Sequence, residues 1–444
     1  MTPSRHGSEV VDDISVSFRP MAPRRSSETG LTRSFITNLA LKTFYYRNDM
    51  AGHEVARALH LPFSVVEEHL EELRREKLVE VKGAEGTGTA TYRFAISQLG
   101  RERAREALRV SQYVGPAPVT LKDYTDGLLA QTCGRDPLNA SILQAGLSHL
   151  VLPDEVISQV GPALSAQRSL FLYGAPGNGK TVLAEAIGRA LGGDLLIPHA
   201  IEVDGQVIKV LDPIFHGETA EDGGTSGPVG MPSIASFEAE RADARWVSVR
   251  RPVVFAGGEL TLEMLDLNFN VREGFYEAPL QMKANGGVFI VDDFGRQMVT
   301  PRDLLNRWIV PLEKGVDFLS LHTGRKFPIP FSAMVVFATN LKPQELVDEA
   351  FLRRIRYKVE MRDPEPEAYL EIFTRECQAR GIEPKREAVA YIYRNYYNGK
   401  QIPVRACHPR DLLDKILESA RWNGETPDLN PETIDLVCSS YFLN

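Results

Sequence analysis

The sequence predicts an α/β core, in which helices flank a parallel sheet, between a small helical unit and a helical bundle. Short apolar runs at residues 170–173 and 288–291 are typical of buried strands, and each leads into a polar or glycine-rich turn. A third apolar run, SAMVVFATNL, has the same character and leads to Asn340. Helical patterns fill residues 363–444, whereas residues 31–112 combine helices with one hairpin.

Composition restricts the class of protein. The chain has 444 residues, enough for about three domains. Its net charge of -8 argues against a dedicated nucleic-acid coat, although it leaves room for a local basic face. The 4 cysteines form no CxxC pair, so they suggest neither a disulfide scaffold nor a zinc ribbon. No apolar run approaches the roughly 18 residues of a membrane helix, and the first 30 residues lack a secretory signal. We therefore expect a cytoplasmic protein without a membrane partner.

The N-terminal third begins with a segment of low periodicity. Residues 1–30 are rich in Ser, Pro and Arg, and we expect a disordered tail there. Residues 31–112 follow in the order helix, helix, helix, strand, wing, strand, helix, which resembles a winged helix-turn-helix domain. Ser64 precedes the third helical pattern, with Glu67 three residues later, so the pair is expected to cap that helix.

A winged helix usually suggests DNA binding, but the charges of the predicted recognition helix favour a protein partner. Acidic side chains outnumber basic ones: Glu67, Glu68, Glu71, Glu72 and Glu76 stand against Arg74, Arg75 and Lys77. Such a face would meet phosphates with like charge. Docking or packing against protein is the favoured interpretation, and binding of duplex DNA stays as the alternative.

Three further segments follow. Residues 113–149 are expected to form a linker and helical collar, and residues 150–362 the α/β core. Within the core, residues 216–240 are rich in Gly and acidic side chains, so we expect a mobile loop there. Residues 363–444 are expected to form a helical lid.

The strongest motif is the glycine-rich turn in SLFLYGAPGNGKTVLAEAIGRAL. It matches G-x-x-x-x-G-K-[ST] from Gly174 to Thr181, between a strand and a helix. Glycines let backbone N–H groups approach phosphate oxygens, Lys180 can reach the β and γ phosphates, and the Thr181 hydroxyl can ligate Mg²⁺. We therefore expect ATP and Mg²⁺ as cofactors. The expected nucleotide-binding residues are Gly174, Ala175, Pro176, Gly177, Asn178, Gly179, Lys180, Thr181 and Val182.

Polar side chains follow two other predicted strands. In GGVFIVDDFGR, Asp292 is expected to hold Mg²⁺ and Asp293 to orient or activate the attacking water. Asn340 could bind the γ-phosphate or the same water. Each of these residues, taken alone, is also compatible with an ordinary turn after a strand. The glycine-rich motif upstream favours the catalytic interpretation.

Three arginines in the last part of the chain are candidates for contact with phosphate. Arg353 and Arg354 end a short predicted helix, and a paired arginine that cannot reach its own site can complete a neighbour's site in a ring. The alternative is a solvated or salt-bridged pair. Arg410 begins a helix of the C-terminal bundle, from which it could fold over the nucleotide, or it could be a helix-capping or surface arginine.

The ordered set of P-loop, acid pair, asparagine, arginine pair and lid arginine resembles the AAA+ ATPase family over roughly residues 150–425. The resemblance implies a ring, commonly a hexamer, with ATP bound between protomers. It also implies individual roles: Thr181 and Asp292 on Mg²⁺, Asp293 as base, Asn340 as sensor 1, Arg353 and Arg354 as fingers in trans, and Arg410 as sensor 2.

Two departures from the family pattern affect what is expected. The second acid of the pair is usually Glu, and Asp293 is one methylene shorter, which predicts a closer water or slow turnover. The segment between Lys180 and Asp292 is also longer than in a plain core, with strands predicted around Gly257 and Gly258. These strands and the hairpin-like VDFLSLHTGRKFPIPF look similar to the MoxR-like and helix-2-insert branches of the family.

Three functions are compatible with these observations. The favoured one is a ring-shaped ATPase that remodels, assembles or disassembles a protein client, which the N-terminal domain recruits. The second is a DNA-directed AAA+ ATPase that binds duplex DNA through the winged helix. The third is a nucleotide-gated scaffold with little turnover, which the short side chain of Asp293 suggests.

Overall fold

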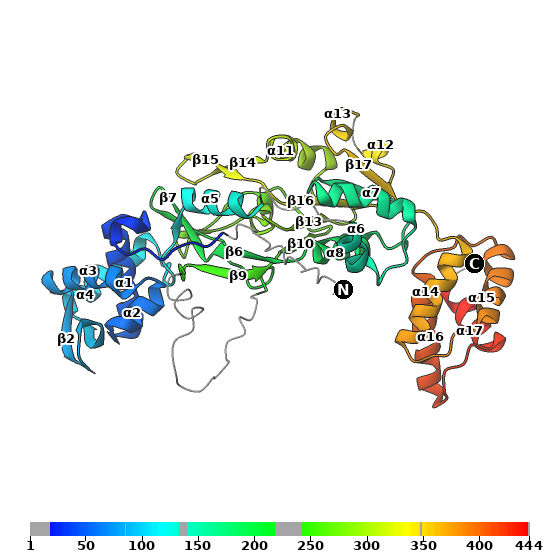
Figure 1. Cartoon of the computed structure of the whole chain (residues 1–444), viewed down its shortest axis with the longest axis horizontal. Helices are drawn as coiled ribbons and strands as arrows, with labels where there is room; N and C mark the ends of the chain where they lie inside the picture. Colours follow the sequence, from blue (N-terminus) through cyan, green and yellow to red (C-terminus); the bar gives the residue numbers. More distant parts are fainter. Residues whose placement is uncertain (1–17, 85, 133–139, 218–241, 347–348, 443–444) are drawn as a thin grey trace, which may run out of the picture.

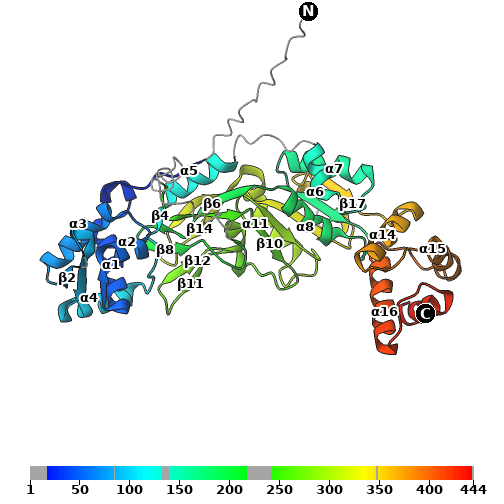
Figure 2. The same ribbon diagram turned by 60° about the horizontal axis from the view of Figure 1, so that its bottom comes forward.

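The computed structural model describes residues 18–84, 86–132, 140–217, 242–346 and 349–442. The chain is elongated, with the N-terminal helical unit at one end and the C-terminal helical bundle at the other (Figure 1). The sheets lie between them, and the same order is seen after a 60° turn (Figure 2).

The core is built on a five-stranded sheet in which all neighbouring strands are parallel. The strand order is β10-β13-β16-β5-β17, so the chain crosses over the sheet between consecutive strands. The three central strands are almost wholly buried, as expected for a parallel sheet covered on both faces. The bounds are β5 (Leu170–Tyr173), β10 (Val253–Ala256), β13 (Val288–Val291), β16 (Met334–Thr339) and β17 (Tyr357–Glu360).

Helices cover both faces of this sheet. Leu183 and Ile187 of α8 pack with one set of alternating strand residues, and Leu304 and Trp308 of α11 pack with the other set. The predicted α/β core with a parallel sheet between helices is therefore confirmed. The helices of the core are α6 (Ala140–Leu147), α7 (Asp154–Ser165), α8 (Lys180–Ala190), α10 (Leu280–Lys283), α11 (Pro301–Lys314), α12 (Pro343–Leu346) and α13 (Glu349–Leu352).

A second five-stranded sheet, of order β11-β12-β8-β7-β4, is inserted beside the core. Two antiparallel ribbons, β6 with β9 and β14 with β15, accompany it. The ribbon β14–β15 confirms the hairpin predicted before the third core strand. The bounds are β4 (Val119–Thr120), β6 (Asp194–Pro198), β7 (Ala200–Val203), β8 (Gln206–Lys209), β9 (Trp246–Arg250), β11 (Asn268–Asn270), β12 (Phe275–Glu277), β14 (Val316–Ser320) and β15 (Lys326–Pro330), with a 3₁₀ turn at Glu263–Leu265.

The segment predicted as a linker and collar has a larger structural role than that. Residues 119–120 form strand β4, which pairs with β7 in the inserted sheet. Helix α5 (Leu121–Thr132) follows, and its Tyr124 and Leu128 are buried in the core of that sheet. The prediction missed this because a strand of two residues carries no periodic signal.

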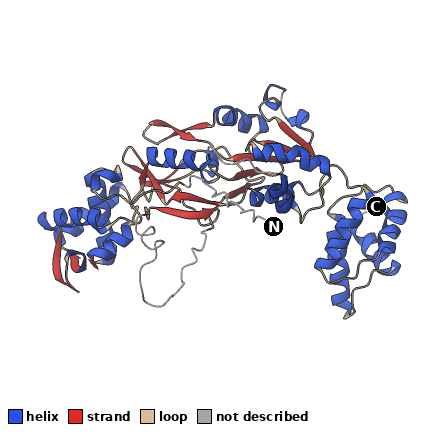
Figure 3. Cartoon of the chain, viewed as in Figure 1, coloured by secondary structure: helices blue, strands red, loops and turns tan. Residues whose placement is uncertain are grey.

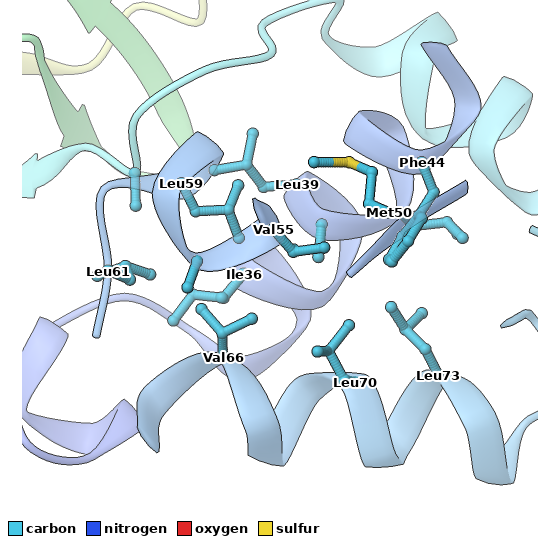
Figure 4. Packing of buried hydrophobic residues seen from close by; sticks show 14 of the residues in the cluster. Ile36, Leu39, Phe44, Met50, Val55, Leu59, Leu61, Val66, Leu70 and Leu73 are labelled. Carbon is cyan, nitrogen blue, oxygen red and sulfur yellow. The ribbon is translucent and has the colours of Figure 1, made fainter. Parts of the chain in front are cut away.

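The N-terminal unit has the predicted order of helices and strands, with one short strand added. Its sheet has the order β1-β3-β2 and is antiparallel. Apolar side chains from α1, α2 and α3 form its core (Figure 4). The bounds are α1 (Arg33–Arg47), β1 (Asp49–Ala51), α2 (Gly52–Leu59), α3 (Phe63–Arg75), β2 (Val79–Ala84), β3 (Tyr92–Ile96) and α4 (Gln98–Val110), with a 3₁₀ turn at Thr89–Thr91.

Two expectations for this unit were wrong. Residues 18–30 of the predicted tail are packed: the 3₁₀ helix Ser26–Thr29 is partly buried, and Ser26 Oγ lies 2.9 Å from His69 Nε2. Residues 1–17 lie outside the described residues. Helix α3 begins at Phe63 after Pro62, two residues earlier than predicted, so Ser64 is no cap and its hydroxyl donates to the backbone oxygen of Arg24 instead (3.4 Å).

The N-terminal unit is docked on the inserted sheet. Arg245 and Asp243 form a buried ion pair (2.7 Å), and the Arg245 guanidinium also donates to the backbone oxygens of Thr29 (3.4 Å) and Pro118 (3.3 Å). The ring of His60 in the C-cap of α2 packs edge-on against His199, with centroids 4.8 Å apart. One arginine thus joins the N-terminal segment, the linker and the sheet.

The predicted mobile loop lies almost wholly outside the described residues, from residue 218 to 241. Its first residue, His216, is buried: its Nδ1 accepts from the backbone N–H of Asp212 (2.9 Å) and its Nε2 lies 2.8 Å from the backbone oxygen of Lys283. The first residue of the predicted loop is therefore packed rather than mobile.

The C-terminal bundle has its own apolar core, separate from that of the sheets. It consists of helices only (Figure 3). Buried tyrosines contribute to it, and the hydroxyls of Tyr369 and Tyr397 are 2.7 Å apart. The bounds are α14 (Pro366–Ala379), α15 (Arg386–Ile392) with a π-helical turn at Tyr393–Asn398, α16 (His408–Asn423) and α17 (Pro431–Tyr441).

Candidate nucleotide-binding site

The predicted site residues meet at one edge of the core sheet. Strands β13, β16 and β5 are neighbours and run parallel, so their carboxyl ends lie together. The glycine-rich turn follows β5, the acid pair follows β13, and Asn340 follows β16. This edge is the usual place for a ligand in an open parallel sheet.

Lys180 lies at the centre of this edge, at the start of α8. Its ammonium group donates to three oxygens: the backbone oxygens of Gly174 (3.0 Å) and Ala175 (2.9 Å), and Oδ1 of Asn340 (2.7 Å). Only 7% of the residue is exposed. Burial lowers the pKa of Lys180, an effect that the nearby Asp292 and Asp293 oppose.

Thr181 and Asp292 form the second pair of the site. The Thr181 hydroxyl donates to the Asp292 carboxylate, 3.0 and 3.1 Å from its two oxygens. Hydroxyl and carboxylate oxygens are the ligands that Mg²⁺ prefers. The two groups that the sequence assigned to Mg²⁺ are therefore adjacent, and their chemistry fits that ion.

Asp293 and Asn340 form the third pair. The amide of Asn340 donates to Asp293 Oδ1 (2.9 Å), while its own oxygen accepts from Lys180. Asp293 is exposed and has a φ of 47°, which is unusual for a residue with a side chain. Lys180, Asn340 and Asp293 thus form a continuous polar chain across the edge of the sheet.

The glycine-rich turn has the backbone that the motif requires. Gly174, Gly177 and Gly179 all have positive φ, at 137°, 83° and 77°. The Asn178 side chain, by contrast, is bonded to the Asp363 carboxylate (2.7 Å), so its amide nitrogen is engaged within the protein. Among the other predicted binding residues, Pro176 and Val182 are exposed and Ala175 is half-buried.

Arg353 and Arg354 lie at the opposite edge of the sheet. With Arg356 they border a cavity of about 940 Å³, which is also lined by the residues just before β5 and by the end of α11. Arg353 is 77% exposed and bonds Glu349 (2.9 Å), and Arg354 bonds Glu313 (2.5 Å). The predicted arginine pair is therefore separated from the P-loop of its own chain by the length of β5.

Arg410 lies in the first turn of α16, and its role at the nucleotide edge stays a prediction. Its guanidinium is bonded to the adjacent Asp411 (2.9 Å). A different lid arginine, Arg405, lies there and binds Asp363, the acid that Asn178 also contacts. Sequence reasoning missed Asp363 and Arg405; Asp363 comes three residues after the end of β17, whereas Asp292 follows β13 directly.

The described residues show neither a cluster of metal ligands nor a membrane-spanning helix. They contain no group of three or more His, Cys, Asp and Glu side chains that is arranged to hold a metal ion. None of the helices described is both long and apolar enough to cross a bilayer.

Comparison with known proteins gives a local family match and distant structural likenesses. Residues 365–440 match a family described as a domain of unknown function (DUF8689). No curated protein sequence matches the chain. Residues 365–440 cover the helices of the C-terminal bundle, so the matched family describes that bundle.

The solved structures that resemble the chain share little sequence with it. NtrX from Brucella abortus in complex with ATP is 14% identical, with 64% of this chain and 56% of that chain covered and a TM-score of 0.37. A RuvB mutant of Thermotoga maritima is 12% identical, covers 65% and 69%, and has a TM-score of 0.36. Domain III of the T. maritima replication initiation protein DnaA is 13% identical, covers 69% and 100%, and has a TM-score of 0.37.

The chain spans little more than half the length of the NtrX structures. The order of the strands in the chain itself, with the residues that follow them, establishes the fold. The asparagine strand lies between the acid-pair strand and the P-loop strand in the sheet, and a helical bundle follows the sheet in the chain. On this geometry the chain has the fold of an AAA+ P-loop ATPase.

Proposed function

We propose that the chain is a Mg²⁺-dependent ATP hydrolase. The observation that carries the proposal is the convergence of Lys180, Thr181, Asp292, Asp293 and Asn340 at the carboxyl edge of the sheet. An ammonium, a hydroxyl next to a carboxylate, and a carboxylate next to an amide are the groups that phosphoryl transfer requires.

Lys180 binds the phosphates. Without nucleotide, its charge is held by three oxygens of the chain itself. Phosphate oxygens carry more negative charge than a backbone or amide oxygen, so they would displace these acceptors. The glycines of the turn leave the backbone N–H groups open to the same phosphates, at the N-terminus of α8.

Thr181 and Asp292 would hold the metal. Mg²⁺ bound there would neutralise charge that develops on the phosphates during transfer. The hydrogen bond between the two side chains keeps both sets of oxygens at one position, ready for a cation.

Asp293 and Asn340 handle the attacking water. The Asp293 carboxylate accepts the proton of the water, and the amide of Asn340 holds that carboxylate in place. Asp293 is one methylene shorter than the glutamate usual in the family, so the water has to approach the backbone more closely. Slow turnover follows if that approach is hindered, which is the basis of the scaffold alternative.

Arg353 and Arg354 act on the nucleotide of a second copy. The cavity that they border begins beside Ser169, whereas the P-loop begins at Gly174, at the other end of β5. No rearrangement of these side chains alone brings them across the sheet. A ring or another repeating assembly, in which one protomer's arginine edge faces the next protomer's P-loop, removes this difficulty.

An experiment that mixes two inactive variants tests the assembly and the hydrolysis together. Lys180→Ala should abolish nucleotide binding and hydrolysis, and the double variant Arg353→Ala/Arg354→Ala should bind ATP but not hydrolyse it. A mixture of the two should recover activity, because some interfaces then pair an intact P-loop with an intact arginine edge. Normal hydrolysis by the double variant alone would refute the trans assignment.

We further propose that the ATPase remodels a protein client that the N-terminal unit recruits. The acidic surface of α3 supports a protein partner, but less strongly than its composition suggested. Glu72 is bonded to Arg33 (2.9 Å), Glu68 lies 3.9 Å from the same guanidinium, and Glu67 is bonded to Thr89, so three of the five glutamates are used within the unit. Binding of duplex DNA is therefore retained as the alternative.

A trapped variant distinguishes these partners. Asp293→Asn should bind ATP and stall, so the client should stay attached when tagged protein is recovered from its native cells. Lys180→Ala, which cannot bind ATP, is the matched control. A discrete protein on the trap alone supports remodelling, whereas nuclease-sensitive DNA on the trap would favour the DNA-directed function.

A further inference from the structure

The turn that carries the acid pair has a backbone that needs support. It runs from Asp292 to Gln297 and follows strand β13 directly. Asp293 stands in it with a φ of 47°, a conformation that a residue with a side chain keeps only where its surroundings hold it. The hydrogen bond from the Asn340 amide holds the Asp293 carboxylate (2.9 Å) but not the backbone around it. Two side chains to which the sequence assigned no role hold that backbone.

Thr339 holds the part of the turn that follows the second acid. It is the last residue of β16, immediately before Asn340, and only 1% of it is exposed. Its hydroxyl donates to the backbone oxygen of Phe294 (2.7 Å) and accepts from the backbone N–H of Leu341 (3.2 Å). The backbone N–H of Phe294 donates to the oxygen of Ala338 (2.7 Å), so both backbone polar groups of Phe294 are bonded to β16. The residue before the asparagine is thereby tied to the residue after the second acid.

Gln297 holds the part of the turn that contains the first acid. Its amide nitrogen donates to the backbone oxygen of Asp292 (2.6 Å), and its amide oxygen accepts from the backbone N–H of Gly295 (2.8 Å). One half-buried side chain thus joins the start of the turn to its middle, and both ends of its amide are used. Gln297 therefore acts beside Asp292, whereas Thr339 acts beside Asp293.

We propose that Thr339 and Gln297 are positioning residues that hold the two carboxylates of the acid pair where phosphoryl transfer needs them. The inference rests on the proposed function, to which it adds two residues that act through other side chains. Thr339 determines where Asp293 meets Asn340, because its hydroxyl ties the backbone on either side of that contact. Gln297 determines the direction of the Asp292 carboxylate, because it holds the backbone oxygen of that residue.

The short second acid makes the backbone position matter more. A glutamate could reach a displaced water by changing the rotamers of its longer side chain, whereas the carboxylate of Asp293 follows its own backbone closely. Displacement of a reacting group by about 1 Å can lower a rate by about 100-fold. Both hydrogen-bond sets act on the backbone of the turn, which determines where an aspartate carboxylate can lie.

Hydrolysis and nucleotide binding, measured on the full-length chain, separate positioning from folding. Thr339→Val keeps the shape of the side chain and removes its hydroxyl, so kcat should fall by about 10- to 100-fold. The Kd for mant-ATP, a fluorescent ATP analogue, should stay within about twofold of wild type. Thr339→Ser, which keeps the hydroxyl, should recover most of the rate.

Thr43→Val is the matched control for the loss of a buried hydroxyl. Thr43 is 3% exposed and lies on α1 of the N-terminal unit, where its hydroxyl donates to the backbone oxygen of Leu39 (2.9 Å). The same chemical change is thereby made outside the nucleotide edge. Both kcat and the Kd for mant-ATP should stay at the wild-type values in this variant.

Gln297→Met should have a different signature, because it frees the other part of the turn. The side chain keeps its length and loses both hydrogen bonds, so the gain in mant-ATP affinity on adding Mg²⁺ should shrink by about 5-fold or more. Thr339→Val should keep that gain in full. The readout is an equilibrium binding constant, so it does not depend on turnover.

Four results would overturn the inference in whole or in part. A rate for Thr339→Val within about twofold of wild type would remove Thr339. So would a Thr339→Ser variant as slow as Thr339→Val, or a loss of affinity as large as the loss of rate. An unchanged Mg²⁺ gain in Gln297→Met would remove Gln297. If wild type binds and hydrolyses nucleotide no better than Lys180→Ala, the proposed function itself fails, and this inference with it.

Discussion

Alanine at each glycine of the P-loop should destabilise the nucleotide-free protein to a different extent. Gly179 has open space where a Cβ would stand, so only its φ of 77° opposes the change. At Gly177 a Cβ would also lie 2.6 Å from Cys407 Sγ. At Gly174 it would lie 2.4 Å from the backbone oxygen of Met361. These substitutions therefore separate backbone strain from contact with the lid and with the core.

The structure predicts how the free-energy costs of the three alanine substitutions rank. A residue with a Cβ in the left-handed region costs about 1–2 kcal/mol, which is the whole expected effect at Gly179. Steric overlap adds about 1–3 kcal/mol, so Gly177→Ala should cost roughly 2–5 kcal/mol. Gly174→Ala should be at least as costly, because a backbone oxygen cannot rotate away as a side chain can.

Thermal unfolding without nucleotide ranks the destabilisation by the three alanine variants, since 1 kcal/mol shifts the unfolding midpoint by about 2–4 °C in a domain of this size. Cys407→Ala should recover most of the extra cost of Gly177→Ala and none of that of Gly174→Ala, with Cys407→Ala alone as control. Equal midpoints for Gly177→Ala and Gly179→Ala, or no recovery, would mean that Cys407 does not rest on the P-loop in solution.

Three further predictions concern the N-terminal unit and its docking. Burial lowers the pKa of His199 to about 4, so folding keeps the imidazole neutral. The contribution of His199 to stability is therefore fully present above about pH 6.5 and falls by about 2 kcal/mol by pH 5. In unfolding measured against pH, His199→Phe should flatten that slope. Burial lowers the pKa of Lys42 to about 8, so its charged form opposes folding. Lys42→Met should therefore stabilise the folded protein by up to about 3 kcal/mol at pH 7. That gain in unfolding free energy should shrink as the pH rises from 8 toward 10.5. Arg245→Leu leaves Asp243 buried without its partner and should cost about 3–5 kcal/mol in denaturant unfolding, whereas a cost below 1 kcal/mol would contradict the buried pair.

The carboxyl edge of the core sheet could be predicted because its signals are local. Each of the three strands that supply the site is a short apolar run, and the functional residues follow directly in the chain. Parallel pairing then brings Lys180, Asp292 and Asn340 together, although they are far apart in sequence. The glycine pattern of the P-loop is equally local, since it depends on the φ angles of single residues.

The inserted sheet and the lid contact could not be predicted in the same way. Strand β4 has two residues and pairs with β7, far along the chain, so no periodicity marks it. The contact of Arg405 with Asp363 depends on the path of the irregular segment before α16, which residue pattern does not determine. Asp363 escaped the rule that identified Asp292, because β17 is only partly buried and ends three residues before it.

The attachments of the two end units give them different parts in a nucleotide cycle. The lid touches the P-loop itself, through Asn178, Ala406 and the backbone of Gly177, so a change at the phosphates reaches it within one contact. The N-terminal unit is attached through Arg245 and His60 to the inserted sheet, and no hydrogen bond or ion pair described links it to the P-loop. A change at the nucleotide must cross the core and the inserted sheet before it reaches that unit. The lid therefore lies one contact from the proposed nucleotide site, whereas the N-terminal unit is separated from it by two layers of structure.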